Sequence, residues 1–113
     1  MQKLIDQTKI HGAALNTVDG LPVISVFKNG KKFDDALISA LSSTMTMHSE
    51  KVIDEFDYGS LNNCKIKGEN GQVLIFKINT SLILIILAPK SISQGIIQLG
   101  VKNSIRSFQK INL

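Results

Sequence analysis

Few side chains in this 113-residue sequence are able to perform covalent chemistry. Cys64 is the only cysteine, and His11 and His48 are the only histidines. A thiol becomes an effective nucleophile when a base such as histidine lies within hydrogen-bond reach. Cys64 falls on the apolar face of a predicted strand, and His48 falls on the apolar line of a predicted helix. The sequence therefore predicts a buried, unreactive thiol and a packed or interface histidine.

Metal and phosphate sites are also disfavoured by spacing. No pair of histidine and cysteine residues has the spacing of a zinc site. The segment Asn29-Gly30-Lys31-Lys32 stands between a predicted strand and a predicted helix, where a phosphate-binding loop would lie. That motif needs a glycine five residues before its Gly-Lys pair and a hydroxyl residue after it, but the chain has Ser25 and Lys32 there. We therefore predict no catalytic residue, no metal and no cofactor, and expect that the protein is not an enzyme.

The composition, 43% hydrophobic and 19% charged residues, is typical of a globular protein. The longest apolar run, at 82–88, is far shorter than the roughly 20 residues of a membrane-spanning helix. Near the N-terminus only two apolar residues, Leu4 and Ile5, precede the charged Asp6, so the long apolar stretch of a signal peptide is missing. We therefore predict one domain over residues 1–113, a cytoplasmic location and no membrane insertion.

The net charge of +4 is unevenly distributed along the chain. Residues 1–57 carry six lysines against eight acidic residues, whereas residues 58–113 carry seven basic residues against Glu69 alone. A basic half attracts nucleic acid, anionic lipid or an acidic protein surface. These basic residues are spread over several predicted elements, and one tyrosine, five phenylalanines and no tryptophan offer little for bases to stack on. We predict no nucleic-acid binding.

Glycine, asparagine and proline divide the chain into alternating helices and strands. The predicted elements are a helix at 1–8, strands at 10–17 and 21–27, a helix at 33–57, strands at 61–69, 72–78 and 81–88, and a helix at 92–110. Short links between strands require antiparallel pairing, and the run at 82–87 is apolar on both faces, so its strand belongs in the middle of the sheet. The predicted fold is α/β, a five-stranded antiparallel sheet sandwiched by helices in the order α-β-β-α-β-β-β-α.

The helix predicted at 33–57 is long and amphipathic. Its apolar line consists of Leu37, Leu41, Met45, His48, Val52 and Phe56, with Ala36, Ala40, Thr44 and Met47 beside it. Asp34 and Asp35 in the first turn complement the helix dipole, and Gly59 is expected to end the helix.

Four short motifs and a glycine near the start of the last predicted helix, taken in their order and spacing, carry a resemblance to a known family. They are Gly12-Ala13-Ala14-Leu15, Val18-Asp19-Gly20-Leu21-Pro22-Val23-Ile24-Ser25, Gly68-Glu69-Asn70-Gly71, Leu84-Ile85-Ile86-Leu87-Ala88-Pro89 and Gly95. Over nearly its whole length the chain resembles the roadblock, or dynein light-chain (LC7-like), family. The resemblance implies a profilin-like fold and a scaffold or regulator of Ras-like small GTPases. An adaptor or sensor module of a motor, trafficking or signalling complex, without GTPase contact, is the alternative.

The resemblance also implies a homodimer or heterodimer, in which the long helices pair and the edge strands after them join the two sheets. Applied to this sequence, the expected interface residues are Ala36, Ala40, Thr44 and Met47 of the helix, and Asn63 and Lys65 of the strand. As an alternative, Ala36 and Ala40 pack on the chain's own sheet. Lys65 and Lys67 disfavour pairing of the edge strand, so the helix contact is the better supported of the two.

Overall fold

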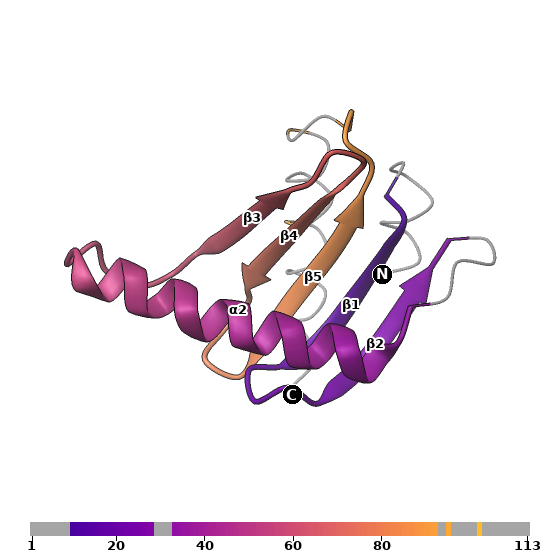
Figure 1. Ribbon diagram of the computed structural model, residues 1–113. Coiled ribbons are helices and arrows are strands. Elements are labelled where there is room, and N and C mark those ends of the chain that lie inside the picture. The colour runs from indigo at the N-terminus through magenta and orange to yellow at the C-terminus, as the bar shows by residue number, and fades with distance from the viewer. Residues whose placement is uncertain (1–9, 29–32, 93–94, 96–101, 103–113) are drawn as a thin grey trace.

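A five-stranded antiparallel sheet carries one long helix on one of its faces (Figure 1). In this computed structural model the described residues are 10–28, 33–92, 95 and 102. The elements are β1 (Gly12–Thr17), β2 (Pro22–Phe27), α2 (Asp35–Glu55), β3 (Asn63–Lys67), β4 (Gln72–Lys77) and β5 (Leu82–Ala88). The strand order is β2-β1-β5-β4-β3, and neighbouring strands are antiparallel.

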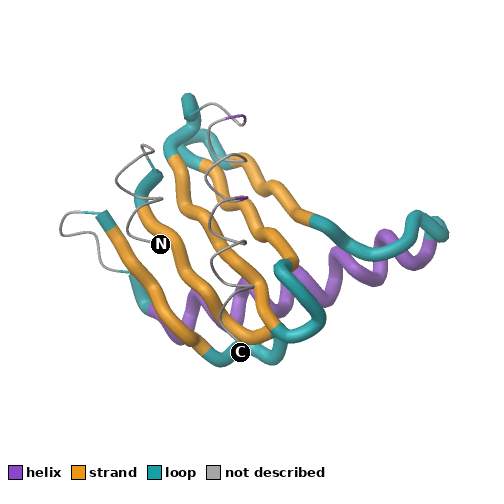
Figure 2. The backbone as a smooth tube through the Cα atoms, turned by 180° about the vertical axis from the view of Figure 1, so that it is seen from behind, coloured by secondary structure: helices purple, strands orange, loops and turns teal. Residues whose placement is uncertain are grey.

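The predicted fold class is confirmed by the antiparallel sheet and its long helix. Seen from behind, α2 lies on the far side of the sheet (Figure 2). The predicted helices at 1–8 and 92–110 lie outside the described residues, apart from Ile92, Gly95 and Lys102, and so does the loop at 29–32.

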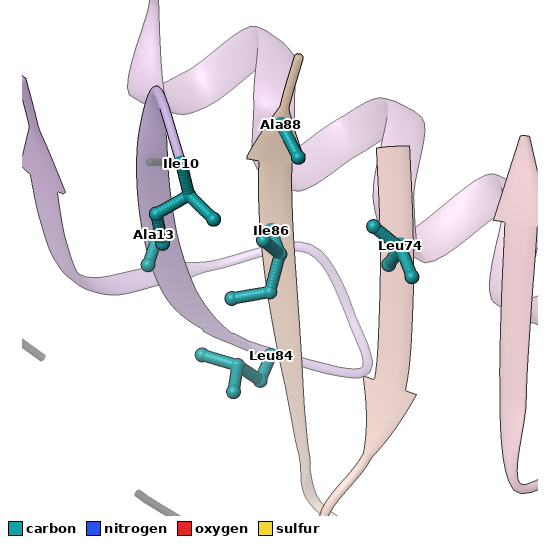
Figure 3. Packing of buried hydrophobic residues seen from close by; sticks show 6 residues of the cluster. All are labelled: Ile10, Ala13, Leu74, Leu84, Ile86 and Ala88. Atoms are coloured by element: carbon teal, nitrogen blue, oxygen red, sulfur yellow. The ribbon is translucent and has the colours of Figure 1, made fainter. Parts of the chain in front are cut away.

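β5 lies in the middle of the sheet, as its sequence predicts. It pairs with β1 on one side and with β4 on the other, and every residue from Leu82 to Ile86 is at most 6% exposed. Ile83 and Ile85 belong to the cluster that α2 covers. Their neighbours in sequence point to the opposite face, where Figure 3 shows the cluster of Ile10, Ala13, Leu74, Leu84, Ile86 and Ala88. The strand is therefore buried on both faces, which its uninterrupted apolar sequence requires.

Polar contacts hold α2 against the sheet along most of its length. Asp34 caps the helix, because its carboxylate accepts a hydrogen bond of 3.2 Å from the Leu37 N–H. Four further contacts follow along the helix: the Ser25 hydroxyl donates to Asp35 at 2.8 Å, Ser43 donates to the Val18 carbonyl, Ser49 donates to the Cys64 sulfur at 3.5 Å, and the Lys77 ammonium pairs with Glu50 at 2.6 Å.

The C-terminal end of α2 differs from the expectation that Gly59 ends the helix. Asp57 adopts the left-handed conformation there, with φ of 56°, and the N–H of Tyr58 donates to the Ile53 carbonyl at 3.1 Å. This pattern closes many helices, and aspartate tolerates the left-handed region better than most residues. Gly59, with φ of 87°, lies in the loop that leads back to β3.

Candidate protein-interaction surface

The apolar line of α2 is mostly exposed. Its side chains at 37, 41, 52 and 56 are between 55% and 61% exposed. The side of the helix that meets the sheet instead carries Ser39, Ser42 and Thr46, none of them more than 5% exposed. An amphipathic helix ordinarily buries its apolar side, so this helix presents an apolar surface that has no partner among the described residues.

An apolar groove runs beside this line, between α2 and the half of the sheet near β3. The helix packs most closely on β1 and β2, which leaves an open groove of about 350 Å³ over β3, β4 and β5. Its walls include Ile38, Leu41 and Met45 from the helix and Ile66, Val73 and Leu87 from the three strands. The Thr44 hydroxyl in its lining donates to the Ala40 carbonyl at 2.9 Å, so its proton is not free for a ligand.

All six residues predicted for the dimer interface are exposed. Ala36, Ala40, Thr44 and Met47 lie on α2, and Asn63 and Lys65 lie on β3, which forms one edge of the sheet. The alternative that Ala36 and Ala40 pack on the chain's own sheet is therefore wrong. Thr44 borders the apolar groove, whereas Met47 lies on the other flank of the helix. Contact of these six residues with a second copy stays a prediction.

The other flank of α2 carries both polar and apolar side chains. A cleft of about 410 Å³ separates it from the turns after β1 and β4, and its walls include Asp19, Ser43, Glu50 and Lys77. Glu50 and Lys77 form an ion pair with side chains 37% and 25% exposed, which contributes little to stability because water screens it. The two flanks of the helix therefore differ in chemistry: the groove is almost wholly apolar, whereas the cleft also carries charged and hydroxyl groups.

A comparison with protein-family models matches residues 1–88 to the roadblock/LC7 domain. This chain belongs to the roadblock/LC7 family. The resemblance drawn from the motifs is thereby confirmed, although no curated protein sequence matches the chain.

Solved structures agree on the roadblock/LC7 fold. A roadblock/LC7 domain from Streptomyces avermitilis is 15% identical, with a TM-score of 0.88 over 97% of this chain and 92% of that one. MglB from Myxococcus xanthus is 14% identical, with a TM-score of 0.88 over 96% and 88%. The gliding protein MglB from Thermus thermophilus is 12% identical, with a TM-score of 0.87 over 97% and 83%. At such identities the likeness shows the fold alone.

The candidate nucleophile of this roadblock/LC7 domain, Cys64, lies against the core rather than in a catalytic arrangement. Its side chain is partly buried, packs against the cluster that α2 covers, and accepts a hydrogen bond from Ser49. His48 is exposed on α2. Within residues 10–28 and 33–92, no group of three or more His, Cys, Asp or Glu residues is placed to hold a metal ion. The described helix is also not long and apolar enough to cross a membrane.

The groove is the candidate binding site that the sequence did not predict. Ile66, Val73 and Leu87 come from three strands and meet only because the sheet places β3, β4 and β5 side by side. The sequence signal that pointed to it is the apolar line of α2, which in this roadblock/LC7 domain faces the groove and solvent.

Proposed function

We propose that residues 1–113 form one roadblock/LC7 domain that acts in the cytoplasm as a dimeric, non-enzymatic scaffold or regulator of a Ras-like small GTPase. The observation that carries the proposal is the apolar surface of α2 and its groove, which has no partner among the described residues. Contiguous exposed apolar surface on a protein of this size marks a protein-binding site. Family membership supplies the class of partner.

A second copy of the chain is the proposed first partner. Two α2 helices that pack antiparallel across a two-fold axis cover the apolar line of both copies with one self-complementary contact. The β3 edges meet at the same axis, with Asn63 and Lys65 at the junction. Since Lys65 and Lys67 repel their symmetry mates there, the helices carry most of the affinity. A further MglB structure, 12% identical to this chain, is described as having a tetrameric arrangement, which supports assembly as a property of this fold.

The GTPase is the proposed second partner, and this chain supplies no catalytic group to it. Stimulation of GTP hydrolysis by a partner uses either an inserted arginine or a reshaped GTPase site. Arg106 is the only arginine and lies outside the described residues, on the helix predicted at 92–110. A regulator built from this chain therefore acts by binding, through recruitment or through reshaping of the GTPase's own active site.

Co-elution with light scattering tests the proposal. The purified chain is mixed with each Ras-like GTPase of its own source, loaded with GDP or with a GTP analogue, and the mass of every complex is measured. A nucleotide-dependent complex on a dimer supports a regulator. A dimer that binds none of the GTPases refutes the GTPase contact and favours the adaptor function. A chain that is monomeric at every concentration refutes the scaffold dimer.

A further inference from the structure

We propose that the aromatic pair at the end of α2, Phe56 and Tyr58, is an anchor that fills the apolar groove of a second copy. The inference rests on the proposed dimer and adds to it the occupant of the groove. The C-terminal end of α2 projects past β3, so no strand of its own sheet lies beneath it (Figures 1 and 2). Phe56 is 61% exposed and Tyr58 is 75% exposed, and their rings stack with centroids 5.9 Å apart.

The direction of Phe56 follows from helix geometry. Ile38 lines the groove of its own chain. Phe56 comes eighteen residues later, which is about five full turns, so both side chains leave the helix in the same direction. Phe56 is therefore directed beyond the edge of the sheet in the way that Ile38 is directed onto the sheet. An apolar ring at that place stays in contact with water unless a second sheet lies beneath it.

The reach of the helix past its own sheet matches the place of such a second sheet. Ser49 of α2 donates to the Cys64 sulfur of β3, and Phe56 comes seven residues later, about 10 Å along the helix. Strands lie about 4.8 Å apart, so this distance crosses up to about two strand spacings. Since β3 is the edge strand, two spacings beyond it end over β3 and β4 of a copy joined at its own β3 edge, where Ile66 and Val73 line that copy's groove.

The groove suits an aromatic side chain better than a small polar ligand. Ile66, Val73 and Leu87 form its sheet side, and Met45 on its helix side makes a favourable contact with an aromatic ring. Binding sites for small molecules place a few polar groups to orient the ligand, and the Thr44 hydroxyl here already donates to its own helix. Two-fold symmetry then gives two anchors and two grooves, each filled by the other chain.

Sedimentation equilibrium of Phe56→Ala against the wild type tests the anchor. Loss of the Phe56 ring from both copies is expected to raise the dimer dissociation constant by about 100-fold. Leu21→Ala is the matched control, because Leu21 is 64% exposed but lies beside β2, at the opposite edge of the sheet. Circular dichroism checks that both variants fold, which is expected for changes at exposed positions.

Disulfide trapping supplies a second, direct readout. Both chains carry Cys64→Ser, which removes the native thiol. One chain also carries Phe56→Cys and a longer tag, so that it differs in mass from the other chain, which carries Ile66→Cys. The two chains are mixed and oxidised. The mixed cross-link is expected, and replacing Ile66→Cys by Leu21→Cys abolishes it. A wild-type chain that is monomeric overturns both the proposed dimer and the anchor. A wild-type dimer with an unchanged dissociation constant for Phe56→Ala and no cross-link between 56 and 66 overturns the anchor alone.

Discussion

Leu41→Glu is expected to separate dimerisation from folding. Leu41 is 58% exposed and lines the groove, so a second copy is able to cover more than half of its side chain. Full burial of a leucine contributes about 1.5–3 kcal/mol, so completing its burial adds roughly 1–2 kcal/mol for each chain. The two-fold symmetry makes this contact twice in each dimer. The dissociation constant of the dimer is therefore expected to rise by a factor between roughly 30 and several hundred. The glutamate charge, which loses water on association, adds to this effect.

Sedimentation equilibrium over a range of concentrations measures this change, and urea unfolding measures its effect on the fold. The free energy of unfolding of the monomer is expected to change by no more than about 0.5 kcal/mol, because the position is exposed and glutamate is a good helix former. Leu21→Glu, at a leucine that is 64% exposed beside β2, is the matched control and leaves the dimer unchanged. An unaltered dimer in Leu41→Glu, or equal weakening by both variants, would refute the reasoning.

Three further predictions concern the fold and the regulatory role. Gly12→Ala is expected to cost about 1–3 kcal/mol of unfolding free energy, because a Cβ there meets the ring of Phe27; an unchanged urea midpoint contradicts this. Asp34→Ala removes the cap that accepts from the Leu37 N–H and is expected to cost about 1 kcal/mol, measured the same way, while Asp34→Asn retains most of the stability. Arg106→Ala is expected to leave any stimulation of GTP hydrolysis unchanged; loss of stimulation with binding intact would show that this arginine acts as a finger.

The sheet was predictable because its signals are local. The run at 82–87 has no polar residue to place on a solvent face, which requires the middle position that β5 occupies. Short connections then fix antiparallel neighbours. The element ends are less predictable: the strand expected at 61–69 is β3 at Asn63–Lys67, and the helix ends before Gly59 because Asp57 takes the left-handed position.

The surface was only partly predictable, because it depends on how α2 lies across the sheet. The sequence shows an apolar line and a polar remainder, and the usual rule places the apolar line on the core. Here the close approach of α2 to β1 and β2 is made through small hydroxyl residues such as Ser39 and Ser42. Once a helix is assumed, its period gives the direction of each side chain around the helix axis. The tilt of α2 across the sheet, which opens the groove over β3, is a property of the tertiary structure.

The outward orientation of the apolar line bears directly on assembly. The hydrogen bonds that hold α2 on its own sheet run from the Ser25 hydroxyl on Asp35 near its start to the Ser49 hydroxyl on the Cys64 sulfur in its second half, and Ile38 and Met45 add apolar contacts with the cluster beneath. Apart from Met45, the apolar line contributes little to the fold of one chain, because its other side chains are mostly exposed there. Substitutions along it are therefore able to change the affinity or the choice of partner without unfolding the domain. Such a separation of folding from assembly is what a scaffold needs in order to pair with itself or with a related chain.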